Sequence, residues 1–143
     1  MKEYYIFNIK KEFMRLYKDK PSQLFYIFNR IYYMKEIDKA YGYNLFCQIS
    51  DFFDKKELNR YITNRYKDKI MYSVANSEHI INNLFLNEIS ILKVKSSNIK
   101  IETNVEHPAF FKVLKEYSLN LFICDFKEQN FYFLKNIKTK INT

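Results

Sequence analysis

Few residues of this 143-residue chain have the types and spacings that chemistry requires. The two histidines, His79 and His107, have no partner at a spacing typical of metal ligands. A nucleophile–base pair of Cys124 with His107 would rest on residue type alone, because no motif connects the two. His107 directly precedes Pro108, which suits a residue at the start of a helix. The sequence therefore predicts a protein that is not an enzyme and uses no metal or cofactor.

The remaining reactive side chains have simpler explanations. Asp51, Asp54 and Glu57 cluster before a predicted helix, where interaction with the helix dipole accounts for them. Cys47 and Cys124 lie far apart in apolar surroundings, and free buried cysteines behave as small apolar side chains. Two such cysteines do not indicate a secreted disulfide framework. None of these residues favours catalysis.

The composition predicts one folded domain. Apolar residues make up 48% of the chain and aromatic residues 19%, a content that disordered proteins lack. Gly42 is the only glycine, which excludes a glycine-rich phosphate loop and a dinucleotide fingerprint. We find no signal peptide and no apolar run of about 18 residues. The chain is therefore expected to be cytoplasmic and to have no membrane partner.

A formal net charge of +8 at pH 7 makes a small nucleic-acid-binding domain the alternative function. In that alternative, dispersed lysines contact phosphates, and affinity falls steeply as salt is raised. The positive charge is mostly lysine spread along the whole chain, whereas base readout favours arginine and clustered charge. This distribution favours a solvated surface, so no direct nucleic-acid partner is expected.

The N-terminal segment has the character of a protein-binding surface. An aromatic and β-branched run over 4–9 predicts a strand, and a helix is predicted over 11–17. Phe13 and Tyr17 are four residues apart, so their rings lie on one face of that helix. Either the pair packs inward with Leu16 as core, or it is an exposed anchor pair. Cations surround it at Lys10, Lys11, Arg15, Lys18 and Lys20.

The order of the other predicted elements indicates an α+β fold. Further helices are predicted from Pro21 to about residue 34, from Asp54 to about residue 67, and from Pro108 to residue 117. Asp54 and Glu57 resemble a capping box at the start of the second of these. The segment 37–53 is ambiguous, and 43–50 could be a strand with Leu45, Cys47 and Ile49 on one face.

Alternating apolar residues over 88–103 predict a hairpin, a second hairpin is predicted over 119–126 and 130–134, and 70–74 is a strand or an extended connection. The prediction is one compact domain over 1–143, with a mixed or antiparallel sheet whose hairpins pack against several helices. The polar segment 135–143 is expected to be a frayed tail.

Two blocks of the sequence resemble the SirA family, the sporulation inhibitors of replication. The first block is Tyr4-Tyr5 followed by Ile9-Lys10-Lys11-Glu12-Phe13 and Tyr17. The second block is Phe110-Phe111-Lys112-Val113-Leu114-Lys115, followed by Asp125-Phe126 and Leu134. The blocks occur at the two ends of the chain, in the order in which the family has them.

This resemblance implies a partner and an interface. Members of the family bind the N-terminal domain of the replication initiator DnaA and block its assembly at the origin, which implies a monomer in a one-to-one complex. Phe13 and Tyr17 match aromatic interface residues of the family, and Gln48 matches an interface glutamine. Arg15 and Lys18 are expected to speed encounter with an acidic partner. The family has an Asn-Pro pair where this chain has Lys135 and Asn136.

Overall fold

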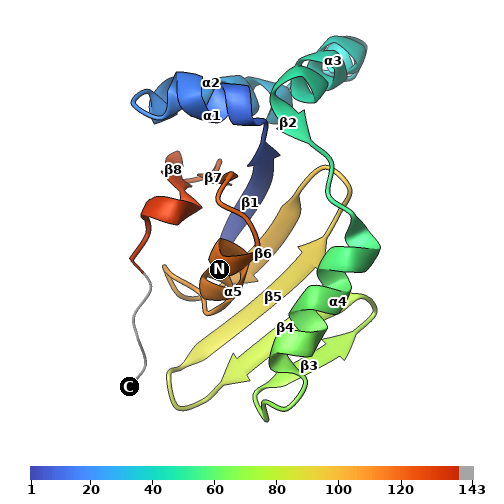
Figure 1. The fold of residues 1–143 in the computed structure, drawn as a ribbon, viewed down its shortest axis with the longest axis vertical. Helices are drawn as coiled ribbons and strands as arrows, with labels where there is room; N and C mark the ends of the chain where they lie inside the picture. Colours follow the sequence, from blue (N-terminus) through green and yellow to red (C-terminus); the bar gives the residue numbers. More distant parts are fainter. Residues whose placement is uncertain (139–143) are drawn as a thin grey trace.

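An eight-stranded antiparallel sheet forms the centre of the computed structural model, which describes residues 1–138 (Figure 1). Seven strands follow the order β3-β4-β5-β6-β1-β7-β8, and the short β2 pairs with β1. The strands are β1 (Lys2–Ile9), β2 (Ser50–Asp51), β3 (Tyr72–Ala75), β4 (Glu78–Asn83), β5 (Glu88–Val94), β6 (Ile99–Thr103), β7 (Leu121–Asp125) and β8 (Asn130–Phe133). The α-helices are α1 (Lys11–Tyr17), α2 (Pro21–Tyr32), α3 (Lys39–Ile49), α4 (Lys55–Tyr66) and α5 (Phe110–Tyr117), and the 3-10 helices are η1 (Glu36–Asp38) and η2 (Leu134–Asn136). The predicted single α+β domain is confirmed.

The central strand β1 contributes to apolar cores on both faces of the sheet. Because successive side chains of a strand point to opposite faces, Tyr4 and Ile6 belong to one core cluster and Phe7 and Ile9 to the other. The neighbouring strand β7 divides its side chains in the same way, which explains why apolar residues follow one another without alternation from Tyr4 to Phe7 and from Leu121 to Cys124.

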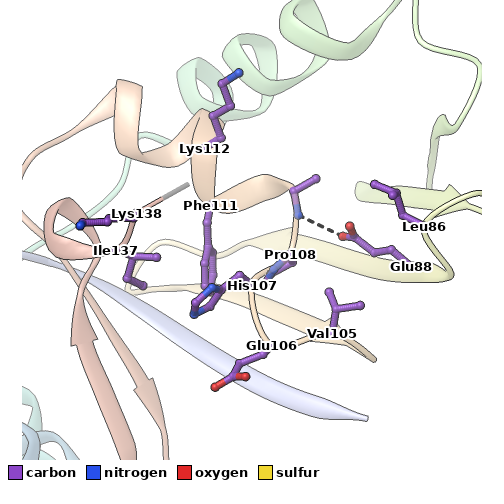
Figure 2. A pocket seen from close by; sticks show the side chains of 11 residues that line it. Leu86, Glu88, Val105, Glu106, His107, Pro108, Phe111, Lys112, Ile137 and Lys138 are labelled. Carbon is purple, nitrogen blue, oxygen red and sulfur yellow. Dashed lines mark hydrogen bonds between the residues drawn. The ribbon is translucent and has the colours of Figure 1, made fainter. Parts of the chain in front are cut away.

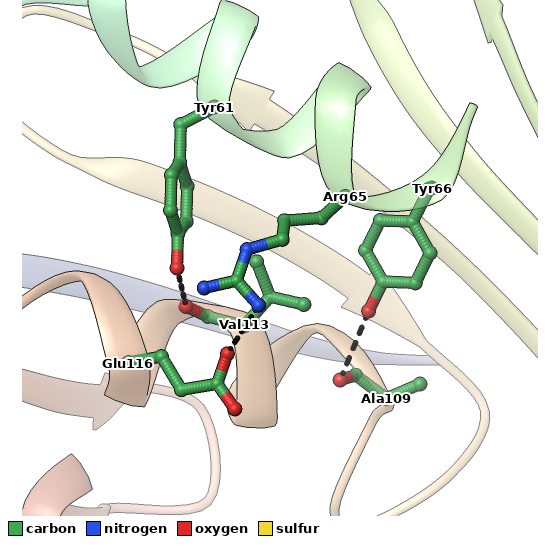
Figure 3. Close-up of polar contacts among 6 residues, drawn as sticks. All are labelled: Tyr61, Arg65, Tyr66, Ala109, Val113 and Glu116. Carbon is green, nitrogen blue, oxygen red and sulfur yellow. Dashed lines mark hydrogen bonds and ion pairs between the residues drawn. The ribbon is translucent and has the colours of Figure 1, made fainter.

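Helices α4 and α5 cover the first face and are joined to each other by polar contacts (Figure 3). The Tyr61 hydroxyl donates to the Val113 carbonyl at 3.0 Å, and the Tyr66 hydroxyl donates to the Ala109 carbonyl at 3.3 Å. Arg65 and Glu116 form an ion pair of 2.8 Å, but both side chains are nearly half exposed, so the pair contributes little to stability. The two tyrosines therefore set the position of α5 against α4.

Helices α1, α2 and α3 pack on the second face through a core rich in phenylalanine. Phe28 of α2 stacks on Phe7 of β1 with a centroid distance of 4.2 Å and an interplanar angle of 12°. Phe25 stacks on Phe131 of β8 at 5.0 Å. This second layer covers β1, β7 and β8, whereas the outer side of β5 carries exposed residues such as Ile89 and Lys93. The molecule therefore has three layers at one end and two at the other.

Most predicted elements are confirmed, with bounds close to those expected. The helices over 11–17 and from Pro21 occur as α1 and α2, and both hairpins occur as β5–β6 and β7–β8. The Asp54 carboxylate accepts the Glu57 N–H at 3.1 Å, which is the predicted cap of α4. The expected extended segment over 70–74 overlaps β3, whose partner β4 was not predicted.

The possible strand over 43–50 is wrong, because this segment is helix α3. Its buried residues are Gly42, Phe46 and Ile49, which are spaced for one face of a helix. A Cβ atom at Gly42 would lie only 2.7 Å from Sδ of Met34. The only glycine of the chain therefore leaves room for the side chain of Met34 against α3.

The expected frayed tail is wrong at its beginning. Lys135 and Asn136 belong to η2, and Ile137 is buried in the same core cluster as Leu134. The ammonium of Lys115 on α5 also donates to the Ile137 carbonyl. Two apolar side chains three residues apart thus fasten this segment against α5, and residues 139–143 lie outside the described residues.

Candidate protein-interaction surface

Helix α1 is short and owes its position to what it packs against. It has seven residues, and Lys10 at its N-cap makes no side-chain capping hydrogen bond. Helices of this length are unstable alone in water. Met14 is its buried residue and belongs to the core under α1–α3, and the Met14 N–H donates to the Lys10 carbonyl at 3.0 Å. The core therefore holds the helix in place.

Phe13 and Tyr17 lie together on the outer part of α1. Their rings are nearly parallel, with an interplanar angle of 12° and a centroid distance of 6.4 Å. Both side chains are half-buried and pack against the edge of the core under α1–α3. The alternative in which Leu16 joins them as core is wrong, because Leu16 is 58% exposed. The pair is thus supported from below and open to solvent above.

The end of α3 lies against the start of α1. The Lys10 N–H donates to the Ile49 carbonyl at 2.9 Å, and Lys10 Nζ donates to the Cys47 carbonyl at 2.7 Å. Gln48 lies between these two acceptors in the chain and is exposed. These contacts bring the backbone at Gln48 next to Lys10, the N-cap of α1, although the two segments are far apart in the sequence.

Charged side chains flank the aromatic pair. Arg15 and Lys18 are exposed, as are Lys11 and the acidic residue Glu12. A shallow groove of about 500 Å³ lies at the start of the helix and is lined by Lys10, Lys11, Glu12, Asp51 and Asn120. We define the α1–α3 surface by its five residues predicted from the sequence, Phe13, Arg15, Tyr17, Lys18 and Gln48.

Two further aromatic side chains near this surface were not predicted from the sequence as candidate interface residues. Tyr43 on α3 and Phe52 after β2 are about half exposed, and their ring centroids are 6.3 Å apart. Phe52 also lies 5.7 Å from the buried ring of Phe46. The helical spacing of Gly42, Phe46 and Ile49 could have placed Tyr43 on the outer face of a helix.

The histidines and cysteines do not form a reactive site. Cys124 is completely buried under α1–α3, and burial raises the pKa of its thiol. His107 is exposed and lines a pocket of about 450 Å³ beside α5 (Figure 2). The two residues thus belong to opposite faces of the sheet. Among residues 1–138, no three metal-ligating side chains come together.

His79 has a structural position. Its Nε2–H donates to Asn59 Oδ1 at 2.8 Å, so Nδ1 accepts from the Tyr72 hydroxyl at 2.7 Å. Only 2% of the residue is exposed, and burial lowers the pKa of its imidazole to about 4. The neutral ring thus connects α4 to the β3–β4 hairpin.

Glu88 is the buried carboxylate in the pocket beside α5. Its Oε2 accepts from Ser90 Oγ at 2.6 Å and from the Ala109 N–H at 3.0 Å, and the second contact is drawn in Figure 2. An N–H group just before a helix has no partner within that helix. The carboxylate therefore fastens the start of α5 to β5.

Comparison with protein families identifies the chain. A family model described as sporulation inhibitor of replication protein SirA matches residues 2–138. The chain belongs to the SirA family. Membership supports a role as an inhibitor of replication, since this is a family of regulatory inhibitors rather than of enzymes. No curated protein matches the chain. Within residues 1–138, no helix is both long and apolar enough to cross a membrane.

Proposed function

We propose that this SirA-family protein binds the N-terminal domain of the replication initiator DnaA through the α1–α3 surface and so blocks assembly of the initiator at the origin. The observation that carries the proposal is the stacked, half-buried pair of Phe13 and Tyr17 on a helix that is fixed by the core. Rigid aromatic side chains bury a large area on binding and lose little conformational entropy.

The two rings are the anchors of the proposed contact. Each is supported on one side by the core under α1–α3, so little reorganisation is needed when a partner covers the other side. Truncation of an anchor of this kind costs about 2 kcal/mol of binding free energy, or about 30-fold in affinity. Gln48 adds an exposed side-chain amide from the segment next to the N-cap of α1, and this amide can donate to or accept from the partner.

The exposed cations have a different role in the proposal. Arg15 and Lys18 remain solvated in the free protein, so they accelerate encounter with an acidic partner more than they add to affinity. Lys135 and Asn136 replace the family's Asn-Pro pair and are exposed on η2, which packs against α5. The proposal therefore rests on α1 and α3 and not on the C-terminal segment.

The protein acts as a monomer in a one-to-one complex in the cytoplasm, where replication initiates, and it needs no catalysis. The alternative of nucleic-acid binding gains little support from the positions of the lysines. Lys11 on α1 and Lys18 at its C-cap lie over one face of the sheet, whereas Lys55 and Lys112 lie on the helices of the other face. Phosphate binding favours charge gathered on one side.

Titration calorimetry with the isolated N-terminal domain of the host's DnaA tests the proposal. We expect saturable one-to-one binding at physiological salt, which weakens about 30-fold or more in Phe13→Ala and in Tyr17→Ala. Tyr17→Phe keeps the ring and is expected to retain most of the affinity. Phe85→Ala removes an equally large ring from the β4–β5 turn and is the matched control. Unchanged affinity in both Ala variants of α1 overturns the site, and absence of binding by folded protein overturns the partner.

A further inference from the structure

Four large apolar side chains protrude from one end of the sheet. Leu84, Phe85 and Leu86 in the β4–β5 turn are 87%, 95% and 54% exposed, and Ile70 before β3 is fully exposed. We call these four residues the apolar tip. Single exposed apolar residues are common on protein surfaces, but a contiguous group indicates an interaction.

The two connections that carry the apolar tip are held side by side. The Asn82 N–H donates to the Met71 carbonyl at 2.9 Å, and Asn83 Nδ2 donates to Met71 Sδ at 3.5 Å. Ile70 therefore lies next to the turn that carries Leu84. In Figure 1 both connections are at the lower edge of the sheet, away from α1, α2 and α3 at the upper end.

Asparagine side chains fix the shape of the β4–β5 turn. Asn83 Oδ1 accepts the Leu86 N–H at 3.1 Å, and the Asn87 N–H donates to the Leu84 carbonyl at 3.3 Å. Asn104 on the neighbouring connection donates to the Asn87 carbonyl at 2.9 Å. These contacts satisfy backbone groups within the turn, which lowers the cost of moving it into a less polar medium.

Two lysines flank the apolar tip at Ile70. Lys67 and Lys69 occur in the same connection as Ile70. Lys112 and Lys138 line the pocket that Leu86 also lines, but Figure 2 shows them across the pocket from Leu86, away from the apolar tip. The exposed carboxylates of this region are Asp68 and Glu106. Glu88 is engaged by Ser90 and Ala109. The connection that carries Ile70 thus has two exposed lysines and one exposed aspartate, in a protein with a net charge of +8.

We propose that the apolar tip inserts into the surface of a lipid bilayer that contains anionic lipids, while the neighbouring lysines contact the head groups. Leucine and lysine are poorly represented among the residues that dominate protein–protein interfaces, whereas apolar side chains flanked by lysine suit the boundary between acyl chains and head groups. No membrane partner was expected from the sequence because it has no continuous apolar segment of about 18 residues. Apolar loops that come together only on folding are not recognised by that criterion.

Vesicle sedimentation tests this proposal on the whole chain. We expect binding to vesicles of phosphatidylglycerol and phosphatidylcholine, and much weaker binding to phosphatidylcholine alone. The Leu84→Ser/Phe85→Ser variant should lose about tenfold or more in partitioning. Leu119→Ser, which changes an exposed leucine between α5 and β7, should bind as the parent does. Because the chain has no tryptophan, Phe85→Trp supplies a single reporter whose emission should shift to the blue on insertion.

Each other outcome overturns the proposal. Binding that persists in the double Ser variant means that lysines alone hold the vesicle. An unshifted Phe85→Trp emission means that the turn stays in water. Self-association in solution that the double Ser variant abolishes assigns the apolar tip to a second copy of the chain. Binding to the DnaA domain should be unchanged in this variant, so the result is independent of the proposed function.

Discussion

The α1–α3 surface and the apolar tip both present apolar side chains, but they hold them in different ways. Phe13 and Tyr17 are half-buried, stacked on each other and supported by the core under α1–α3. Leu84 and Phe85 are almost completely exposed, and hydrogen bonds of the backbone and of the Asn83 side chain fix only the turn beneath them. The first arrangement suits a partner with matching pockets, whereas the second suits a medium without fixed shape. The comparison predicts that only the α1–α3 surface depends on the core.

The largest expected effect comes from removing support beneath the α1–α3 surface. Phe28 is 1% exposed and stacks on Phe7, so Phe28→Ala should lower the free energy of unfolding by about 3–5 kcal/mol. Urea denaturation measures the loss. Hydrogen exchange should rise more in α1 and α2 than in β4 and β5, because those helices rely on this core.

Phe85→Ala is the matched control for the same ring. It should change the free energy of unfolding by no more than about 0.5 kcal/mol, because the side chain is 95% exposed. An equal rise of exchange in α1 and in β5 of the Phe28→Ala protein would contradict the comparison, since the two regions would then unfold as one unit.

The next effect is a loss of stability in acid that acts on the contact between α4 and the β3–β4 hairpin. His79 has a folded-state pKa of about 4 against an ordinary value of 6.5. Between pH 6.5 and about pH 4, His79 is protonated in the unfolded chain but remains neutral in the folded protein. The free energy of unfolding therefore decreases as the pH is lowered through this range. The full loss is about 3 kcal/mol. Urea titrations at a series of pH values measure it.

Variants of the two histidines assign this acid effect. His79→Phe removes the titrating ring, so its stability should lose this pH dependence, although the unpaired Tyr72 and Asn59 make the protein less stable at every pH. His107→Asn retains His79 and should keep the pH dependence of the parent. The same slope in His79→Phe would assign the acid effect to other groups.

Local patterns in the sequence predicted the fold wherever one periodicity was dominant. Phe110, Phe111 and Leu114 repeat with the period of a helix and are buried in α5. The prediction for the segment of α3 was wrong because Leu45, Cys47 and Ile49 also fit the alternation of a strand. The sequence alone did not reveal that Gly42 faces Met34. Strand β4 was not predicted because it is rich in polar residues. Its main buried polar side chain, His79, has its hydrogen bonds satisfied by residues of α4 and β3.

The candidate surface was predictable only in part, for the same reason. The spacing of Phe13 and Tyr17 gave their common face. The position of Gln48 beside α1 depends on hydrogen bonds between Lys10 and the end of α3, which are contacts between distant segments. The apolar tip depends on the junction of two connections through Met71 and Asn82. Sequence patterns do not report such long-range contacts.

The smallest expected effect concerns the junction that brings Gln48 to α1. Lys10→Met keeps the length of the side chain but removes the 2.7 Å hydrogen bond from Nζ to the Cys47 carbonyl. We expect a loss of about 1 kcal/mol in stability and a loss of a few-fold in affinity for the DnaA domain. Lys11→Met removes the same charge from the neighbouring, exposed position. If the two variants lose the same affinity, charge alone explains the effect, and the junction does not organise the surface. A larger loss in Lys10→Met means that the α1–α3 surface depends on contacts within the protein, as the comparison with the apolar tip requires.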